Sequence, residues 1–254
     1  KRLMTASLED IHAALKDTTA GPLTSPDAAR MAESIRAVFN VNAQALRLLP
    51  TKGPSFSIRK WIEGQSRDGS ILFLSARYID LAVCRPLLTL WTDMAMNRLM
   101  ALGRTSDIRL WFLIDELGAL HRLPALENGL QTARNYGGAI VTGVHTFAKI
   151  KSVYGDSVAI TLSALSKTKL LLQTADRETA LWCSDIIGQR QVTKFEDGYS
   201  FGIDNSRDAV SMNQRNVVEP LVLADDLKEL PPLSGYIKFS GGFPAAKVEI
   251  TPVA

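Results

Sequence analysis

One short stretch of the chain, residues 110–114 with the two acids that follow it, constrains the fold most. Five bulky apolar residues in a row are too few for a buried helix and predict a parallel β-strand that is covered on both faces in the middle of a sheet. Asp115 and Glu116 come directly after this run. Ligands of open α/β sheets bind outside the carboxyl ends of the strands, where the loops diverge. We therefore expect both carboxylates at the edge of the sheet where a ligand would bind.

The same spacing is the Walker B pattern of nucleotide hydrolases. In that interpretation Asp115 holds Mg²⁺, directly or through water, and Glu116 orients and deprotonates the water that attacks the γ-phosphate. A strand that simply ends in two solvated acids is the alternative, because the spacing is common in proteins.

Further apolar runs at residues 71–75, 139–144 and 169–172 alternate with helical patterns. Those patterns cover residues 80–102, 124–136, 146–155, 156–166 and 176–188. The alternation predicts an α/β fold whose mostly parallel, doubly wound sheet has flanking helices. The strand at 139–144 would bring His145 to the same edge of the sheet as Asp115.

The N-terminal part, residues 5–50, is helical in pattern. Ser7 with Asp10 predicts a capping box, and Ser25 before a proline predicts a second helix start. That second helix is expected to end between Pro50 and Pro54 and to bury one face, made of Met31, Ile35, Val38, Phe39, Leu46 and Leu49. We expect residues 1–55 to be part of an all-α domain and residues 56–254 to form the α/β domain.

The pattern changes after residue 188. Two loosely alternating runs, residues 192–195 and 216–223, predict strands. The polar residues 196–215 between them predict a hairpin loop or a mobile excursion. Residues 225–227 indicate a helical turn. Residues 236–239 and 246–250 predict a C-terminal edge hairpin.

Composition and residue spacing argue against a zinc site, a disulfide framework and a membrane span. With 254 residues and 46% hydrophobic content the chain can bury a sizeable core, and its net charge of +3 is too small to indicate a nucleic-acid binder by itself. Cys84 and Cys183 form no CxxC motif, and the three histidines do not have metal-ligand spacing. No apolar run is long enough to cross a membrane. The four tryptophans lie within apolar patterns and are expected in the core.

Taken together, four blocks of sequence resemble the type IV secretion coupling proteins of the TraD and TrwB kind. The blocks are WFLIDELGALHRLPAL at 111–126, ARNYGG at 133–138, GVHTFAKIKSVYG at 143–155 and LPPLSGYIKFSGGFPAAKV at 230–248. The order and spacing of four blocks are far more specific than any one of them. The resemblance implies the later part of a RecA-like motor domain, preceded by the end of an inserted all-α domain.

The resemblance also implies roles for single residues. Asp115 and Glu116 fall on the Walker B pair of the family. Arg134 lies where the family has an arginine proposed to reach the nucleotide of a neighbouring subunit, although a surface ion pair on a helix is an equal alternative. His145 stands where the family usually has a glutamine that senses the γ-phosphate of ATP, and a histidine cannot present an amide's paired donor and acceptor.

No phosphate-binding GxxxxGK[ST] loop, the Walker A motif, occurs in the sequence. We therefore expect this chain to bind ATP and Mg²⁺ weakly or not at all, while a longer parent protein is a DNA-stimulated ATPase. The implied function is a hexameric DNA translocase at the cytoplasmic face of the bacterial inner membrane, which links relaxase-bound DNA to the secretion channel. Its partners would be DNA without sequence specificity, relaxosome proteins and channel proteins. The alternatives are a soluble translocase of the FtsK or HerA kind and a non-catalytic docking platform for relaxosome and channel proteins.

Overall fold

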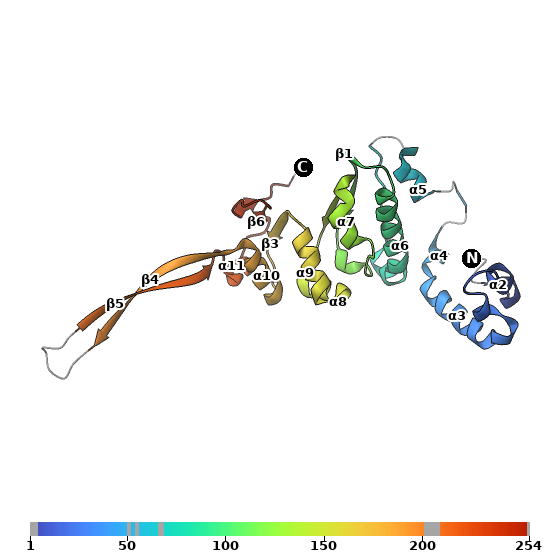
Figure 1. The fold of residues 1–254 in the computed structure, drawn as a ribbon, viewed down its shortest axis with the longest axis horizontal. Helices are drawn as coiled ribbons and strands as arrows, with labels where there is room; N and C mark the ends of the chain where they lie inside the picture. Colours follow the sequence, from blue (N-terminus) through green and yellow to red (C-terminus); the bar gives the residue numbers. More distant parts are fainter. Residues whose placement is uncertain (1–4, 50–51, 54–55, 66–68, 201–208, 253–254) are drawn as a thin grey trace. The chain divides into compact units, whose positions relative to one another are not determined.

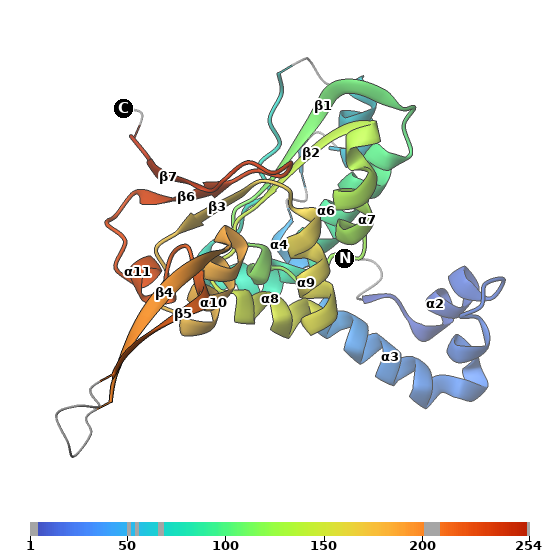
Figure 2. The same ribbon diagram turned by 60° about the vertical axis from the view of Figure 1, so that its left-hand side comes forward.

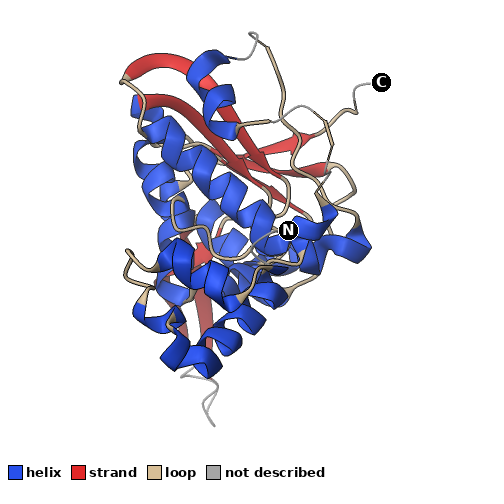
Figure 3. Ribbon diagram, turned by 90° about the vertical axis from the view of Figure 1, so that its right-hand side faces the viewer, coloured by secondary structure: helices blue, strands red, loops and turns tan. Residues whose placement is uncertain are grey.

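The computed structural model describes residues 5–49, 52–53, 56–65, 69–200 and 209–252. The chain folds as two compact units, residues 1–143 and 144–254, and each is described by itself. Helices and strands occur in both units, so the predicted mixed α/β class is confirmed (Figure 3). Among the described residues, no helix is long and apolar enough to span a membrane.

The first unit begins with short helices. They are α2 (Leu8–Leu15), α3 (Ala29–Asn42) and α4 (Ala45–Leu48), with 3-10 turns at Pro22–Thr24 and Pro26–Ala28. The capping box is confirmed, because the Asp10 amide donates to Ser7 Oγ (3.1 Å) and the Ser7 amide donates to an Asp10 carboxylate oxygen (3.4 Å). Ser25 makes no side-chain cap, and α3 begins after the 3-10 turn instead. The predicted helix end at Pro50 and Pro54 lies outside the described residues.

The predicted buried face of α3 is wrong. Met31, Ile35, Val38 and Phe39 are all exposed, with 63% of Val38 accessible to solvent. Ala32 is buried instead, with 5% exposed. The neighbours of α3 within the unit are α2 and the two 3-10 turns, and a small alanine lets such short elements approach closely. The large apolar side chains therefore remain on the open side of the helix.

A long helix follows a segment that sequence patterns assigned to a strand. α5 (Ile58–Lys60) is followed by a single π-helical turn (Trp61–Gln65), and α6 (Leu81–Met100) begins after a 3-10 turn (Tyr78–Asp80). The predicted strand at 71–75 is wrong: these residues have no regular secondary structure, and no described strand pairs with them. Ile71 and Phe73 are 75% and 81% exposed. The apolar run is present, but its hydrogen-bonding partner is not.

The centre of the first unit is a parallel pair of strands, β1 (Thr105–Ile114) and β2 (Tyr136–Thr142), connected through a 3-10 turn (Leu117–Ala119), α7 (Leu126–Thr132) and another 3-10 turn (Ala133–Asn135). Their register pairs Leu110 with Gly138 and Ile114 with Thr142. β2 starts at Tyr136, earlier than the predicted run at 139–144, and includes Gly137 and Gly138. Figure 2 shows the two strands side by side with α6 and α7 next to them.

Only one face of β1 is covered. Met96 and Leu99 of α6 and Leu126 of α7 are almost fully buried, and Phe112 of β1 is buried with them. The alternate side chains point to the other face. Trp111 and Leu113 are 57% and 74% exposed there, so the expectation of a strand covered on both faces, with Trp111 in the core, is wrong.

The second unit contains α8 (Phe147–Tyr154), α9 (Asp156–Leu165), β3 (Lys169–Leu172), α10 (Arg177–Ile187) and α11 (Ala224–Lys228), close to their predicted positions. Within this unit β3 pairs antiparallel with β6 (Ser234–Lys238), which pairs with β7 (Ala246–Glu249) in the predicted hairpin. Among the described strands, the parallel pairing is that of β1 with β2 in the first unit. One buried apolar cluster of the unit consists of Leu171, Cys183, Ile187, Leu227 and Leu230.

A long antiparallel ribbon is formed by β4 (Gln189–Ser200) and β5 (Ala209–Pro220) and is visible in Figure 1. The predicted loop at 196–215 is wrong at both ends, because Glu196 pairs with Asn213 and Ser200 with Ala209. Residues 201–208 lie outside the described part of the chain. Phe195 and Val218 are both exposed. A ribbon that is open to solvent does not need an apolar face, so its sequence lacks the alternation that identifies a strand.

Candidate functional site

Asp115 lies directly after β1, at the end where β2 also stops. The amide of Gly143, the residue after β2, donates to the carbonyl oxygen of Ile114 (2.7 Å), and the Leu117 amide donates to the carbonyl oxygen of Gly143 (3.0 Å). A Cβ atom at Gly143 would overlap with the carbonyl oxygen of Asp115 and lie 2.9 Å from its carbonyl carbon. The backbone of Asp115 is thus packed against the neighbouring strand end, while its side chain is exposed.

Glu116 is half-buried and belongs to the tight turn that follows. One of its carboxylate oxygens accepts a hydrogen bond from the Gly118 amide (2.8 Å), which caps the 3-10 turn Leu117–Ala119. Leu117 and Gly118 are buried beneath it. The two neighbouring acids therefore differ: Asp115 is open to solvent, and Glu116 is held in one orientation by its own loop.

Asp115 has the properties expected of a single magnesium ligand. Within the described ranges no group of three or more His, Cys, Asp or Glu residues is placed to hold a metal ion. Mg²⁺ does not need such a group, because it usually keeps several waters and binds through one or two carboxylates plus phosphate oxygens of the substrate. One exposed carboxylate at the carboxyl end of a parallel strand fits that kind of site.

Arg134 lies at the opposite end of the strands from Asp115. It belongs to the 3-10 turn that leads into β2, and the first residue of β2, Tyr136, pairs with the first residue of β1, Thr105. The seven residues of β2 separate the two ends by about 20 Å. The structure therefore does not bring Arg134 and Asp115 together within one chain.

Arg134 shares a shallow depression of about 580 Å³ with an arginine that sequence patterns did not identify. The depression is lined by Arg104, Thr105, Ser106, Arg134 and Asn135. In the part of the chain that the structure describes, neither arginine side chain has an ion-pair or hydrogen-bond partner, so the surface ion pair considered for Arg134 is absent there. Arg104 precedes Arg134 by thirty residues, and only the parallel pairing of β1 with β2 brings them together.

Gly137 enables the close approach at this end of the strands. Its φ of +77° lies in the left-handed region, and a Cβ atom there would overlap with the carbonyl oxygen of Asp107 and lie 2.9 Å from Thr105 Cγ2. Gly138 is equally constrained, since its Cβ would lie 2.5 Å from Leu99 Cδ2. The absence of side chains at the two glycines allows the turn that carries Arg134 to pack beside the start of β1.

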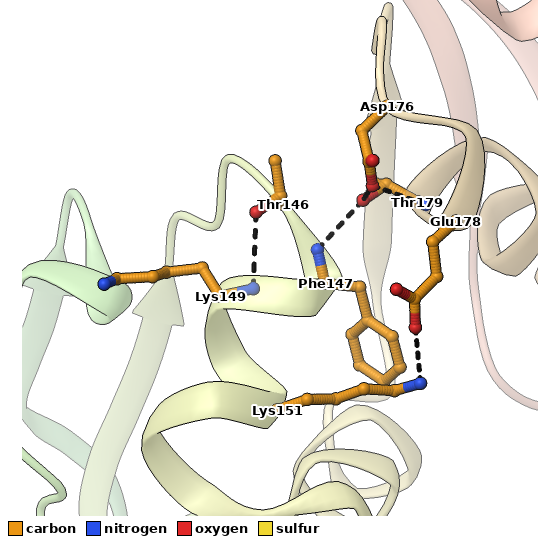
Figure 4. Close-up of polar contacts among 7 residues, drawn as sticks. All are labelled: Thr146, Phe147, Lys149, Lys151, Asp176, Glu178 and Thr179. Atoms are coloured by element: carbon orange, nitrogen blue, oxygen red, sulfur yellow. Dashed lines mark hydrogen bonds and ion pairs between the residues drawn. The ribbon is translucent and has the colours of Figure 1, made fainter.

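His145 belongs to the second unit, where the segment around it is fastened to α10 (Figure 4). Thr146 caps α8 by accepting from the Lys149 amide (3.3 Å). The buried Phe147 amide donates to Thr179 Oγ1 (2.9 Å), whose hydroxyl donates to Asp176 (2.6 Å). The His145 side chain is exposed. Its predicted role beside Asp115, which lies in the first unit, stays a prediction.

Further contacts fix the same junction between α8 and α10. The ring of Phe147 stacks on Trp182 with 4.5 Å between centroids. Lys151 pairs with Glu178 at 2.5 Å (Figure 4). The Thr179 hydroxyl and then the Thr179 amide hold the pKa of the Asp176 carboxyl below its usual value. The hydrogen bond from Lys151 to Glu178 raises the pKa of the lysine. The start of α8, and the segment that leads into it, is thus rigidly supported.

Comparisons with known proteins agree over nearly the whole chain. Residues 1–251 match the family model described as the type IV secretion-system coupling protein DNA-binding domain. Over 253 residues the chain is 31% identical to the coupling protein TraD of Escherichia coli (strain K12), which covers 98% of this chain and 35% of TraD.

Solved structures of the coupling protein TrwB are also similar. An unbound form gives a TM-score of 0.79 at 28% identity, covering 98% of this chain and 56% of that one. TrwB in complex with ADP and Mg²⁺ gives a TM-score of 0.78 at 27% identity, again with 98% and 56% coverage. The chain thus spans about a third of the length of TraD and about half of these TrwB chains.

Proposed function

Because this chain belongs to the type IV secretion-system coupling proteins, we propose that it is the Walker B part of a RecA-like motor that moves DNA at the expense of ATP. In conjugation such a motor would pass relaxase-bound DNA to the secretion channel at the cytoplasmic face of the inner membrane. The observation that carries the proposal is the exposed Asp115 beside the oriented Glu116, at the carboxyl end of a parallel strand pair. TrwB, a relative that matches over almost all of this chain, has been solved with ADP and Mg²⁺.

The geometry suggests a division of roles. Asp115 would hold Mg²⁺, which supplies charge neutralisation at the phosphates when bound. Glu116 would orient a water, with its carboxylate already fixed by the Gly118 amide. His145 would donate one hydrogen bond to the γ-phosphate.

Arg134 would act on a different nucleotide. It lies about 20 Å from Asp115 along β2. It would therefore reach a nucleotide that is held by a second copy of the protein. A ring of identical subunits, such as the expected hexamer, meets that requirement, because each interface supplies one arginine end and one carboxylate end.

The decisive test uses the full-length protein and the variant E116Q. Glutamine keeps an oxygen that can accept from the Gly118 amide, so the turn is preserved while the carboxylate is lost. We expect DNA-stimulated ATP turnover to fall by about 10²–10⁴-fold, the usual contribution of a general base. The control is E229Q, which removes one exposed charge in the second unit. A wild-type rate in E116Q would overturn the proposal.

The chain on its own is expected to bind ATP weakly or not at all. The phosphate-cradling loop and its lysine supply most of the contacts to a triphosphate, and the sequence contains no such loop. Titration with ATP and Mg²⁺ by calorimetry measures this directly. A micromolar dissociation constant for the chain would contradict the expectation.

A docking platform for relaxosome or channel proteins is a second candidate, favoured by the exposed apolar face of α3. Met31, Ile35 and Val38 lie on this face at helical spacing, and each is more than 40% exposed. V38D should weaken capture of a purified relaxase by the chain, whereas A37D, at an exposed position about 100° further around the same helix, should not. Equal capture by both variants and the wild type would count against docking through α3.

A further inference from the structure

We propose that the depression at the start of β1 and β2 is a phosphate site, and that Arg104 is its second guanidinium. Its ligand would be the polyphosphate chain of a nucleotide held by a second copy of the protein. This inference rests on the proposed function. It adds Arg104, a residue to which neither the Walker B pattern nor the resemblance to the family assigns a role. The depression lies wholly within the first unit, and its lining residues come from β1, the residue before it and the turn before β2.

The charge distribution points to an anion with several oxygens. Arg104 and Arg134 are both exposed, and neither side chain has an ion-pair or hydrogen-bond partner among the described residues. Two adjacent guanidinium groups repel each other. A polyanion bound between them attracts both, and this attraction outweighs the repulsion. Guanidinium groups also match phosphate oxygens in a bidentate geometry. A third arginine nearby, Arg109, is already tied to the Gly103 carbonyl oxygen (3.0 Å).

Neutral donors complete the depression. Thr105 and Ser106 contribute hydroxyl groups, and Asn135 contributes an amide. The Thr105 oxygen accepts from the Asp107 amide (3.2 Å), which leaves its O–H group able to donate elsewhere. The two cations and three neutral groups offer more hydrogen-bond donors than the two oxygens of a single carboxylate can accept. The oxygens of linked phosphates can use them all.

The short row of cations favours a compact ligand over a nucleic-acid strand. The depression is shallow, with a volume of about 580 Å³, and the two arginines are the charged residues that line it. A strand of DNA would be expected to follow a longer stripe of cations. Because the depression and Asp115 lie at opposite ends of the same strands, a nucleotide that contacts Arg104 is not the one served by Asp115 of the same chain.

The first experiment measures binding of inorganic tripolyphosphate to this chain by calorimetry. R104Q and R134Q should each weaken binding about tenfold, the effect expected for one charge-assisted hydrogen bond. The control R122Q removes an exposed arginine that does not line the depression and should bind like the wild type. Wild-type affinity in R104Q, or an equal loss in R122Q, would overturn the inference.

A second arm separates phosphate chains from nucleic acid. A short single-stranded oligonucleotide is titrated into the same variants. If Arg104 is needed for the oligonucleotide but not for tripolyphosphate, the site binds DNA and the proposal is wrong. Both arms measure binding and not hydrolysis, so their outcome does not depend on the E116Q test of the motor function.

The third arm tests the second copy. In the full-length protein, R104Q and E116Q subunits are each expected to have low ATPase activity. When they are mixed, an interface between Arg104 of the E116Q subunit and Glu116 of the R104Q subunit is intact, so the mixture should exceed either variant alone. A mixture that is no more active than its components would overturn the assignment to a neighbouring nucleotide.

Discussion

Replacement of Gly143 by alanine should separate the ends of β1 and β2 at the candidate site. A Cβ atom at this position would overlap with the Asp115 carbonyl oxygen and lie 2.9 Å from the carbonyl carbon. Because the obstacle is backbone and not a flexible side chain, one strand end has to move. That movement strains two hydrogen bonds, Gly143 to Ile114 (2.7 Å) and Leu117 to Gly143 (3.0 Å).

The expected loss of unfolding free energy is about 2–4 kcal/mol. Overpacking of a tight site costs about 1–3 kcal/mol. Weakening of two backbone hydrogen bonds adds up to about 1 kcal/mol each. For a chain of 254 residues this corresponds to a melting temperature about 5–15 °C lower.

Urea unfolding followed by tryptophan fluorescence measures the effect, since Trp111 lies in β1. The matched control is G103A, because a Cβ atom at Gly103 meets nothing within 4 Å, and its effect should stay within about 0.5 kcal/mol. If G143A were as stable as G103A, the close packing of the two strand ends would be refuted, and with it the positioning of Asp115.

Three other predictions concern Thr179, Asp176 and the two cysteines. T179V should lower the unfolding free energy by about 1–3 kcal/mol, because the buried Phe147 amide loses its acceptor, whereas T179S keeps the hydroxyl and should lose less; equal urea midpoints for the two would contradict this. Hydrogen bonds from Thr179 lower the pKa of Asp176, so this carboxylate stabilises the fold above its unfolded pKa of about 4, and the stability is lost as the pH falls through the lower folded value. The melting temperature of D176A should therefore lie below that of the wild type at pH 7, and the gap should narrow below about pH 4; a gap that is constant with pH would argue against the hydrogen bond as its cause. Burial raises the pKa of the Cys183 thiol to about 11, so iodoacetamide at pH 8 should modify the half-buried Cys84 first, and mass spectrometry showing equal rates would be inconsistent with the buried site.

The sequence predicted the elements whose signals are local. The capping box of Ser7 with Asp10 depends on residues within one turn and is as expected. The helices predicted to begin near residues 146 and 176 begin at Phe147 and Arg177, each capped by the residue before it. The Walker B run forms β1, and the residues after Ile114 leave the strand as predicted. Such patterns require no knowledge of what packs against them.

The elements that failed depend on partners distant in the sequence. Residues 71–75 have the composition of a strand, but no described strand lies beside them. Met31 and Val38 repeat at helical spacing, but the face they form is uncovered. The predicted strands at 192–195 and 216–223 are parts of β4 and β5, but the outer stretch of the ribbon, where Glu196 pairs with Asn213, was assigned to a loop because it is polar. At the candidate site, Arg104 was missed for the same reason: its proximity to Arg134 exists only through strand pairing.

The two ends of β1 have a consequence for how subunits of an assembly would influence one another. One end lies beside the two arginines, and the other ends at Asp115 and Glu116. In a ring, each such strand would span the distance between two successive nucleotides, one bound by its own subunit and one by the neighbour. Loss of a phosphate at one interface would then change the contacts at one end of β1, and the strand would connect that change to the nucleotide at the next interface. The order in which the subunits hydrolyse ATP would thus depend on a single strand.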